Sequence, residues 1–141
     1  MDTTLPTAIE LQVVTPERLV VSASATAVSL PGKSGCLGIL PGHAPLVSEL
    51  AAGVISYERE GATQRLAVSD GFTEVLPARV IVLARTAERV EEIDIERARS
   101  ARQRAEEQLK RLPDSQDGDE RYQVLAALAR AIARLDAVEE R

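Results

Sequence analysis

Aromatic residues are scarce in this sequence of 141 residues. Tryptophan is absent, and the only aromatic side chains of the Phe, Tyr and Trp class are Tyr57, Phe72 and Tyr122. A site that holds its ligand by ring stacking therefore has few rings available. Hydrophobic residues still make up 45% of the chain, which argues against global disorder. We expect a packed core that rests on Val, Leu, Ile and Ala.

The residues that enzymes most often use as nucleophiles, bases and metal ligands are also few. Cys36 and His43 are each the single residue of their kind, so no intrachain disulfide can form and no His/Cys metal cage can form without carboxylates. The His-Glu-x-x-His, Cys-x-x-Cys and Gly-x-Ser-x-Gly motifs are missing. We expect a non-catalytic protein with no metal site and no required cofactor, in which His43 hydrogen-bonds locally in a turn. A small hydrolase is one alternative, and a substrate screen would test it.

Long apolar runs and excess positive charge are missing as well. No stretch approaches the roughly 20 apolar residues that a membrane helix needs. Residues 1–10 lack the basic segment and apolar run of a secretory signal. The net charge of −5 argues against broad nucleic-acid binding. We expect a soluble protein of a reducing compartment that meets a membrane only through a partner.

Residues 9–85 have the pattern of short β-strands. Segments rich in Val, Ile, Leu and Thr alternate with Gly- and Pro-containing turns, and the expected strands cover residues 9–15, 19–23, 25–30, 53–58, 64–69, 72–76 and 79–85. Asp70-Gly71 between two of these segments predicts a hairpin turn. Many short, closely spaced strands indicate an antiparallel β-sandwich, which we assign to residues 1–88.

The period becomes helical after Glu88. One apolar stripe consists of Ala98, Ala101, Ala105, Leu109 and Leu112. Asp94 is a suitable N-cap for this helix, and Pro113 ends it. A second stripe consists of Tyr122, Leu125, Leu128, Ile132, Leu135 and Val138. Two helices of similar length with a short connection predict an antiparallel helical hairpin over residues 89–141.

The first of these helices is rich in alanine and in basic residues. Alanine buries little area but has a high helix propensity, so the hairpin should be weakly held and able to detach as helix. Residues 97–111 hold six basic and two acidic side chains, a local net charge of +4. This charge suits an acidic partner surface. A solvated helix face with a Glu106–Lys110 pair is the other interpretation.

The loop over residues 35–47 combines special backbone residues with apolar side chains. Gly35, Gly38, Pro41 and Gly42 make it stiff, and stiff loops on sandwiches often present binding surfaces. The spacing Gly-x-x-Gly-Ile-x-Pro-x-His-x-Pro, met at Gly35, Gly38, Ile39, Pro41, His43 and Pro45, resembles the signature of the epsilon subunit family of F-type ATP synthases. Residues 69–75, 79–84 and 126–135 resemble further segments of that family, and the resemblance covers residues 11–138.

This resemblance implies a central-stalk rotor component that links the gamma subunit to the c-ring. The residues expected to contact gamma and the c-ring are Gly35, Cys36, Leu37, Gly38, Ile39, Pro41, His43 and Pro45. In bacterial relatives the hairpin extends into the alpha/beta catalytic head and inhibits ATP hydrolysis. The side chains expected to meet acidic segments of the beta subunits are Arg99, Arg102, Lys110 and Arg111. The resemblance places the protein on the cytoplasmic face of a bacterial plasma membrane, attached peripherally through the c-ring.

Some bacterial relatives bind ATP on the folded hairpin, as a regulatory ligand. Their motif Ile/Leu-Asp-x-x-Arg-Ala is similar to Ile93, Asp94, Arg97 and Ala98 here. The resemblance adds Glu88, Arg104, Arg130 and Arg134 to this site. Arginine forks suit phosphate oxygens, and the last two residues are four apart on one helix. The alternatives are that Asp94 only caps the helix, or that the chain is a stand-alone nucleotide-sensing module.

Overall fold

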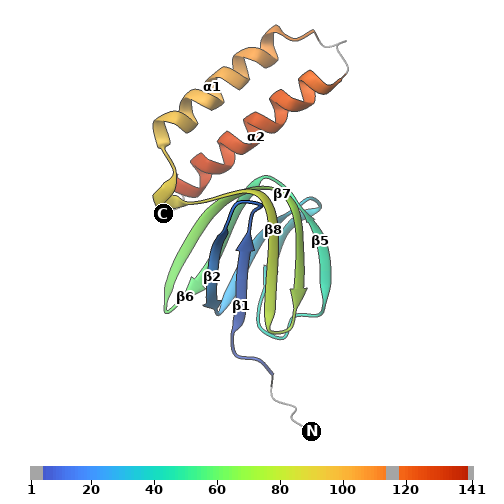
Figure 1. Ribbon diagram of the computed structural model, residues 1–141, viewed down its shortest axis with the longest axis vertical. Coiled ribbons are helices and arrows are strands. Elements are labelled where there is room, and N and C mark those ends of the chain that lie inside the picture. The colour runs from blue at the N-terminus through green and yellow to red at the C-terminus, as the bar shows by residue number, and fades with distance from the viewer. Residues whose placement is uncertain (1–4, 114–117, 140–141) are drawn as a thin grey trace.

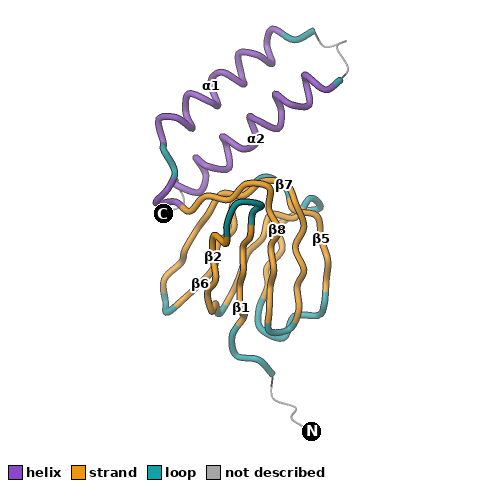
Figure 2. The backbone as a smooth tube through the Cα atoms, viewed as in Figure 1, coloured by secondary structure: helices purple, strands orange, loops and turns teal. Residues whose placement is uncertain are grey.

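The structure is a computed structural model that describes residues 5–113 and 118–139, and it confirms a β-sandwich followed by a helical hairpin (Figures 1 and 2). The strands within these ranges are β1 (Ile9–Val14), β2 (Leu19–Ala25), β3 (Ala27–Gly32), β4 (Gly35–Ile39), β5 (Leu46–Leu50), β6 (Gly53–Arg59), β7 (Ala62–Leu76) and β8 (Arg79–Arg89). They run in the order β2-β1-β8-β7-β5-β3-β4, and β6 pairs with both β3 and β7. The sheet therefore folds over on itself. The β1–β8 pair is parallel, whereas the other pairs are antiparallel.

Strand β7 joins the two layers of the sandwich. Its first part, up to Val68, pairs with β6, and its second part, from Gly71, pairs with β5, while β8 follows it on the other side. The predicted hairpin at Asp70-Gly71 is wrong, because the chain continues through this dipeptide as one strand. Asp70 has φ +47° and Gly71 φ +142°, so the dipeptide makes a kink instead of a reversal.

Glycine is required at the kink. A Cβ on Gly71 would stand 1.8 Å from the carbonyl oxygen of Leu83 on β8. The absence of a side chain thus allows β8 to approach closely while β7 turns from one layer to the other.

Two strands were missed by sequence analysis: β4 lies within the loop that we expected to be stiff, and β5 begins at its end. Strand β4 has the sequence GCLGI and β5 has LVSEL, so neither shows a run of β-branched residues. Strand β4 pairs with β3, and β5 pairs with the second part of β7. Tertiary pairing therefore creates these strands despite weak local propensity.

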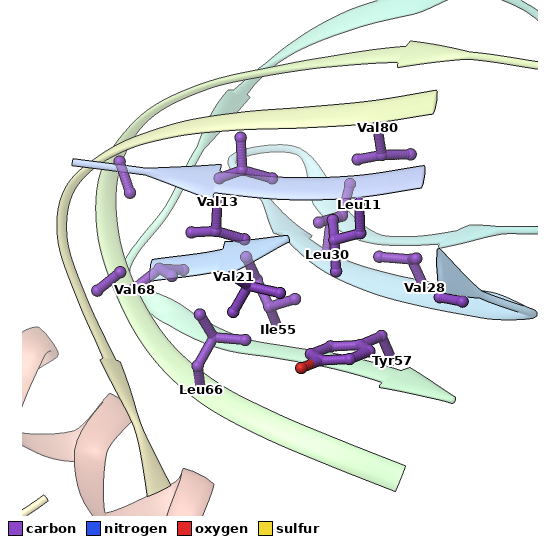
Figure 3. Close-up of a cluster of buried hydrophobic side chains, with 14 of the residues drawn as sticks. Leu11, Val13, Val21, Val28, Leu30, Ile55, Tyr57, Leu66, Val68 and Val80 are labelled. Atoms are coloured by element: carbon purple, nitrogen blue, oxygen red, sulfur yellow. The ribbon is translucent and has the colours of Figure 1, made fainter. Parts of the chain in front are cut away.

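The core is aliphatic, as the composition predicted (Figure 3). Leu11, Leu30, Ile55 and Leu66 are fully buried, and each contributes on the order of 2 kcal/mol by burial. Tyr57 is the one aromatic residue of this cluster, and its ring lies beside these aliphatic side chains. The larger of the two apolar clusters thus lies within the sandwich.

The chain leaves β8 through a short 3-10 turn, η1 (Val90–Glu92), and enters α1 (Ile95–Arg111), followed by α2 (Asp119–Glu139). The Asp94 side chain accepts a hydrogen bond from the backbone N–H of Arg97, which confirms the predicted N-cap. The helices are antiparallel neighbours, and α2 is the one that lies against β6 and β7 (Figure 1). The second apolar cluster, Ala67, Ile93, Ala133, Ala137 and Val138, forms this junction.

The predicted apolar stripe of α2 is only partly buried. Leu135 and Val138 are buried, but Tyr122, Leu125 and Ile132 are exposed. Val124, Ala131, Ala133 and Ala137 are buried in their place. Because α2 packs on α1 and on the sandwich with small side chains, alanine spacing decides which face is buried. No helix among the described residues is long and apolar enough to span a membrane.

Candidate functional site

Residues 90–94 connect β8 to α1, and we call them the hinge segment. A cavity of about 320 Å³ lies where the hinge segment meets both helices. Six of the residues predicted for a nucleotide site line it: Glu88, Asp94, Arg97, Ala98, Arg104 and Arg134. Glu92 and Ala101 complete the wall. Ile93 does not line the cavity and is buried in the junction cluster instead. Residues from β8, from the segment that follows it and from both helices thus converge on one hollow.

The three carboxylates of the cavity are engaged by the protein. Glu88 Oε1 accepts from Arg134 Nε at 2.5 Å. Asp94 caps α1 at 3.1 Å. Glu92 Oε2 accepts from Arg18 Nη2 at 2.8 Å, and its Oε1 accepts from the Arg89 backbone N–H at 3.1 Å. These contacts hold the hinge segment against the β1–β2 turn and against α2.

The Glu92 carboxyl has a lowered pKa. Desolvation by burial is the largest single effect and opposes the charged form, but the hydrogen bonds from Arg89 and Arg18 and the charges of these two residues outweigh it. Glu92 is therefore a stable anion at neutral pH. It fixes the position of the hinge while leaving the cavity open.

The guanidinium groups of Arg97 and Arg104 in the cavity differ from these carboxylates in their ion pairing. Within residues 5–113 and 118–139, neither Arg97 nor Arg104 forms an ion pair. Both side chains are exposed and line the hollow. Arginine forks pair with phosphate oxygens in two parallel hydrogen bonds. The residues present therefore fit a phosphate-bearing ligand.

Arg130 does not line this cavity, although it lies one turn from Arg134 on α2. It lines a separate cleft of about 610 Å³ between α2 and the kinked corner of β7 and β8. The two arginines share a helix but meet different surfaces, because Arg134 lies nearer the end of α2 that contacts the sandwich (Figure 1) and pairs with Glu88 there. The four-residue spacing in the sequence could not show that Arg130 and Arg134 line different hollows.

The segment with the Gly-x-x-Gly-Ile-x-Pro-x-His-x-Pro spacing forms β4 and the turn that follows it. His43 Nδ1 donates to the Ala44 carbonyl at 2.7 Å, and the Gly42 N–H donates to Pro77 at 2.7 Å, so the turn is held locally and to the β7–β8 turn. Cys36 is exposed and lies 3.1 Å from the Ser29 hydroxyl. Gly35 and Gly38, like Cys36, are exposed, and Leu37, Pro41 and His43 are half-buried. Pro45 is exposed, whereas Ile39 is buried in the core and can only support the turn from inside.

The basic residues predicted to meet acidic partners lie on the exposed surface of α1. Arg99 pairs with Glu96 at 2.8 Å, and Arg102 pairs with Glu106 at 2.9 Å. The Glu106–Lys110 pair considered from the sequence is absent among the described residues, because Glu106 faces Arg102. Lys110 and Arg111 lie in the last turn of the helix.

An exposed apolar row on the sandwich was missed by sequence analysis. Neighbouring strands place Leu19, Val14, Leu83 and Phe72 side by side on the outer face. Phe72 and Leu83 are each 55% exposed, and Leu19 is 54% exposed. The signal was present in the continuous apolar run of residues 80–84, which predicts a strand with two apolar faces. We call Val14, Leu19, Phe72 and Leu83 the outer apolar row.

Comparisons with known proteins cover nearly the whole chain. The family profile described as "ATP synthase, Delta/Epsilon chain, beta-sandwich domain" matches residues 8–90. The profile described as "ATP synthase, Delta/Epsilon chain, long alpha-helix domain" matches residues 91–139. The ATP synthase epsilon chain of Moorella thermoacetica is 52% identical over 130 residues, which is 92% of this chain and 95% of that one. That of Koribacter versatilis is 55% identical over 100 residues, 71% and 70% of the two chains.

Two solved structures are similar in fold. A chain of the Euglena gracilis mitochondrial ATP synthase, from a cryo-EM structure of its OSCP/F1/c-ring part, gives a TM-score of 0.81 at 27% identity, covering 99% of this chain and 86% of that one. A chain of the Tetrahymena thermophila mitochondrial ATP synthase central stalk and c-ring gives 0.59 at 12% identity, covering 96% and 99%, which supports the fold alone. Both matches extend across the sandwich and the hairpin.

Proposed function

Because the chain belongs to the ATP synthase delta/epsilon family and is of the bacterial epsilon type, we propose that it is a non-catalytic rotor component that links gamma to the c-ring. Its hairpin is a mobile arm that inhibits ATP hydrolysis. The observation that carries the rotor assignment is the full-length match to family members, supported by two exposed surfaces on a rigid sandwich. The proposed place is the cytoplasmic face of a bacterial plasma membrane, reached through the c-ring.

The first surface is the outer apolar row, which we assign to gamma. A continuous apolar row on the outside of a small domain is typical of a protein interface. The second is β4 with the turn that follows it, where Cys36 is exposed and Leu37 and Pro41 are half-buried, and we assign it to the c-ring and the adjoining part of gamma. His43 and Gly42 hold this turn in shape, so little order is lost on binding.

The inhibitory role is supported by how the hairpin is attached. Helix α1 packs on α2, and the junction of α2 with the sandwich is a small apolar cluster in which Ala67, Ala133 and Ala137 lie beside Ile93 and Val138. Each alanine buries little area, so this cluster holds the hairpin less strongly than a junction of the same size built from larger side chains. The ion pairs of Arg99 and Arg102 are exposed and therefore weak, so they exchange readily for an acidic surface of the beta subunits.

Deleting residues 94–141 tests this proposal in the assembled complex. We expect the truncated chain to assemble and to support ATP synthesis, because the sandwich has its own core. ATP hydrolysis should rise. Unchanged hydrolysis would remove the inhibitory role, and loss of assembly would contradict the assignment of partner binding to the sandwich.

The cavity beside the hinge is proposed to bind ATP as a regulatory ligand. Arg97 and Arg104 would hold phosphate groups, and Arg134 would join them by leaving Glu88 or by sharing its donors. Such a ligand contacts both helices and the hinge, so it would stabilise the folded hairpin by mass action. In this proposal ATP is bound and released without being hydrolysed at this site.

Calorimetry of the isolated full chain with ATP tests this site. Arg97→Gln and Arg104→Gln should each weaken binding by about tenfold, the loss expected for a charge-assisted hydrogen bond of about 1.4 kcal/mol. Arg59→Gln, on the exposed end of β6, is the matched control. Binding by the isolated chain would also support the stand-alone sensing alternative, which the co-purification of ATP synthase subunits would exclude.

A further inference from the structure

The cleft that contains Arg130 has a composition of its own. It opens between α2 and the corner where β7 and β8 kink, at a point where α2 rises away from the sandwich toward its N-terminal end (Figure 1). Its volume of about 610 Å³ exceeds that of the cavity beside the hinge, which is about 320 Å³. One wall comes from the sandwich and the other from the hairpin.

Each wall contributes one arginine. Arg85 comes from β8, and Arg130 comes from α2. Neither guanidinium forms an ion pair in the described part of the chain, whereas Arg134, one turn further along α2, is paired with Glu88. Two like charges that line one cleft repel each other, and an anion between them turns that repulsion into attraction.

The floor of the cleft offers hydroxyl groups. Ser69 Oγ and Thr86 Oγ1 lie 2.5 Å apart, and Ser69 is only 1% exposed. A hydroxyl in such a pair still has hydrogen-bonding capacity, because each group is both a donor and a two-fold acceptor. Gln123 adds an amide from α2. Arginine forks with hydroxyl and amide donors are the groups that bind tetrahedral oxyanions.

One carboxylate, Asp70, also lines the cleft. It stands at the kink of β7, and it pairs with neither arginine in the structure. The positive side chains therefore outnumber the negative one, and both remain available to a ligand.

We propose that this cleft binds a phosphate group, either free or on a small phosphorylated molecule, clamped between Arg85 and Arg130. The clamp joins the hairpin to the sandwich, so the folded hairpin gains stability as the anion concentration rises. The site is separate from the cavity proposed for ATP, and it uses none of the residues that line that cavity.

The test is titration of the full chain with inorganic phosphate by calorimetry, at an ionic strength held constant with chloride. We expect saturable binding with one phosphate per chain. Arg85→Gln and Arg130→Gln should each weaken it by about tenfold. Arg59→Gln, which lines none of the hollows described here, should leave it unchanged. Far-UV circular dichroism without phosphate shows whether each variant keeps its fold.

Two further measurements, trypsin protection and titration with AMP, identify where the anion binds and whether it is free phosphate or a phosphorylated molecule. Trypsin cleavage within residues 95–139 should slow as phosphate is added to the wild type and should not respond in Arg85→Gln. AMP that binds more tightly than phosphate, with the same loss in Arg85→Gln, indicates a phosphorylated molecule, whereas equal affinities indicate the free ion. Binding that is lost in Arg97→Gln but kept in Arg85→Gln overturns the proposal, as does the absence of saturable binding.

Discussion

The Nε group of Arg134 on α2 donates to Glu88 Oε1 on β8 at 2.5 Å, across 46 positions of sequence. Both side chains are about two-thirds buried, at 29% and 32% exposure. This ion pair links α2 directly to the sandwich, and the Arg18–Glu92 pair ties the segment between β8 and α1 to the β1–β2 turn. The folded state of the hairpin therefore depends on charge pairs in addition to the apolar contact of α2 with β6 and β7.

Breaking this pair should loosen the hairpin without unfolding the sandwich. Arg134→Met removes the charge and keeps part of the apolar stem, and it leaves Glu88 partly buried without a partner. We expect amide hydrogen exchange in α1 and α2 to accelerate by about tenfold, for a loss of about 1–2 kcal/mol. Exchange in β1 and β8 should not change.

The control for that experiment is Glu96→Gln. It breaks the Arg99–Glu96 pair, which is mostly exposed and lies within one helix. Its effect should stay within about 0.5 kcal/mol. Equal effects of the two substitutions would show that the Glu88–Arg134 link does not hold the hairpin.

The outer apolar row should be required for binding to gamma and not for folding. Leu83→Glu places a charge at the centre of the row, where the side chain is 55% exposed. We expect a thermal midpoint within a few degrees of the wild type and a loss of affinity for gamma of at least about tenfold. Pull-down and calorimetry with purified gamma measure this.

Gln64→Glu introduces the same charge at an exposed position of β7, in the part that pairs with β6. This control should bind gamma normally. If Leu83→Glu binds as well as this control, the row is not the gamma surface.

The kink in β7 should tolerate no side chain at Gly71. Gly71→Ala combines φ +142° with a Cβ 1.8 Å from the Leu83 carbonyl oxygen, so β8 must move. We expect a loss of at least about 3 kcal/mol in the free energy of unfolding, measured in urea. Gly61→Ala has φ +80° but open space around the Cβ, and it should cost only about 1 kcal/mol.

Stability should depend on pH through Glu92. Its pKa in the folded protein lies below the ordinary value of a glutamate carboxyl, because the hydrogen bonds and charges of Arg89 and Arg18 outweigh desolvation by burial, so the folded state prefers the charged form. The resulting stabilisation is fully present well above pH 4.5 and is lost as the pH falls through the folded pKa. Glu92→Gln should therefore be less stable than the wild type at pH 7.

At a pH below the folded pKa of Glu92 the two proteins should approach each other in stability, because the wild-type carboxyl is then protonated as well. Urea unfolding at both pH values measures the difference. A constant difference between the wild type and Glu92→Gln across this range would contradict the assignment.

Local chemistry made several features predictable from sequence. Asp94 and Pro113 mark the limits of the first helix, because an N-cap and a helix breaker act on adjacent backbone groups. His43 was expected to hydrogen-bond within its turn, and it does. The aliphatic core follows from composition and alternation. Each of these depends on neighbours within a few residues.

The features that sequence analysis missed depend on packing between distant segments. Strands β4 and β5 exist because β3 and β7 offer free edges, and their own residues favour strands only weakly. Asp70-Gly71 has the composition of a hairpin, yet β8 on one side and two different partners on the other keep β7 continuous. Pairing along both edges outweighs the local turn preference.

The sequence by itself determined the two-part architecture, the limits of α1 and the arginine-rich character of the hairpin, because periodicity and capping are local properties. Only the tertiary structure decided which arginines act together. Arg97, Arg104 and Arg134 line one cavity, while Arg130 and Arg85 line another. The physical reason is that Arg130 and Arg134 share a face of α2 but lie one turn apart along its axis, so Arg134 reaches Glu88 of β8 whereas Arg130 lines the cleft at Arg85 and Thr86.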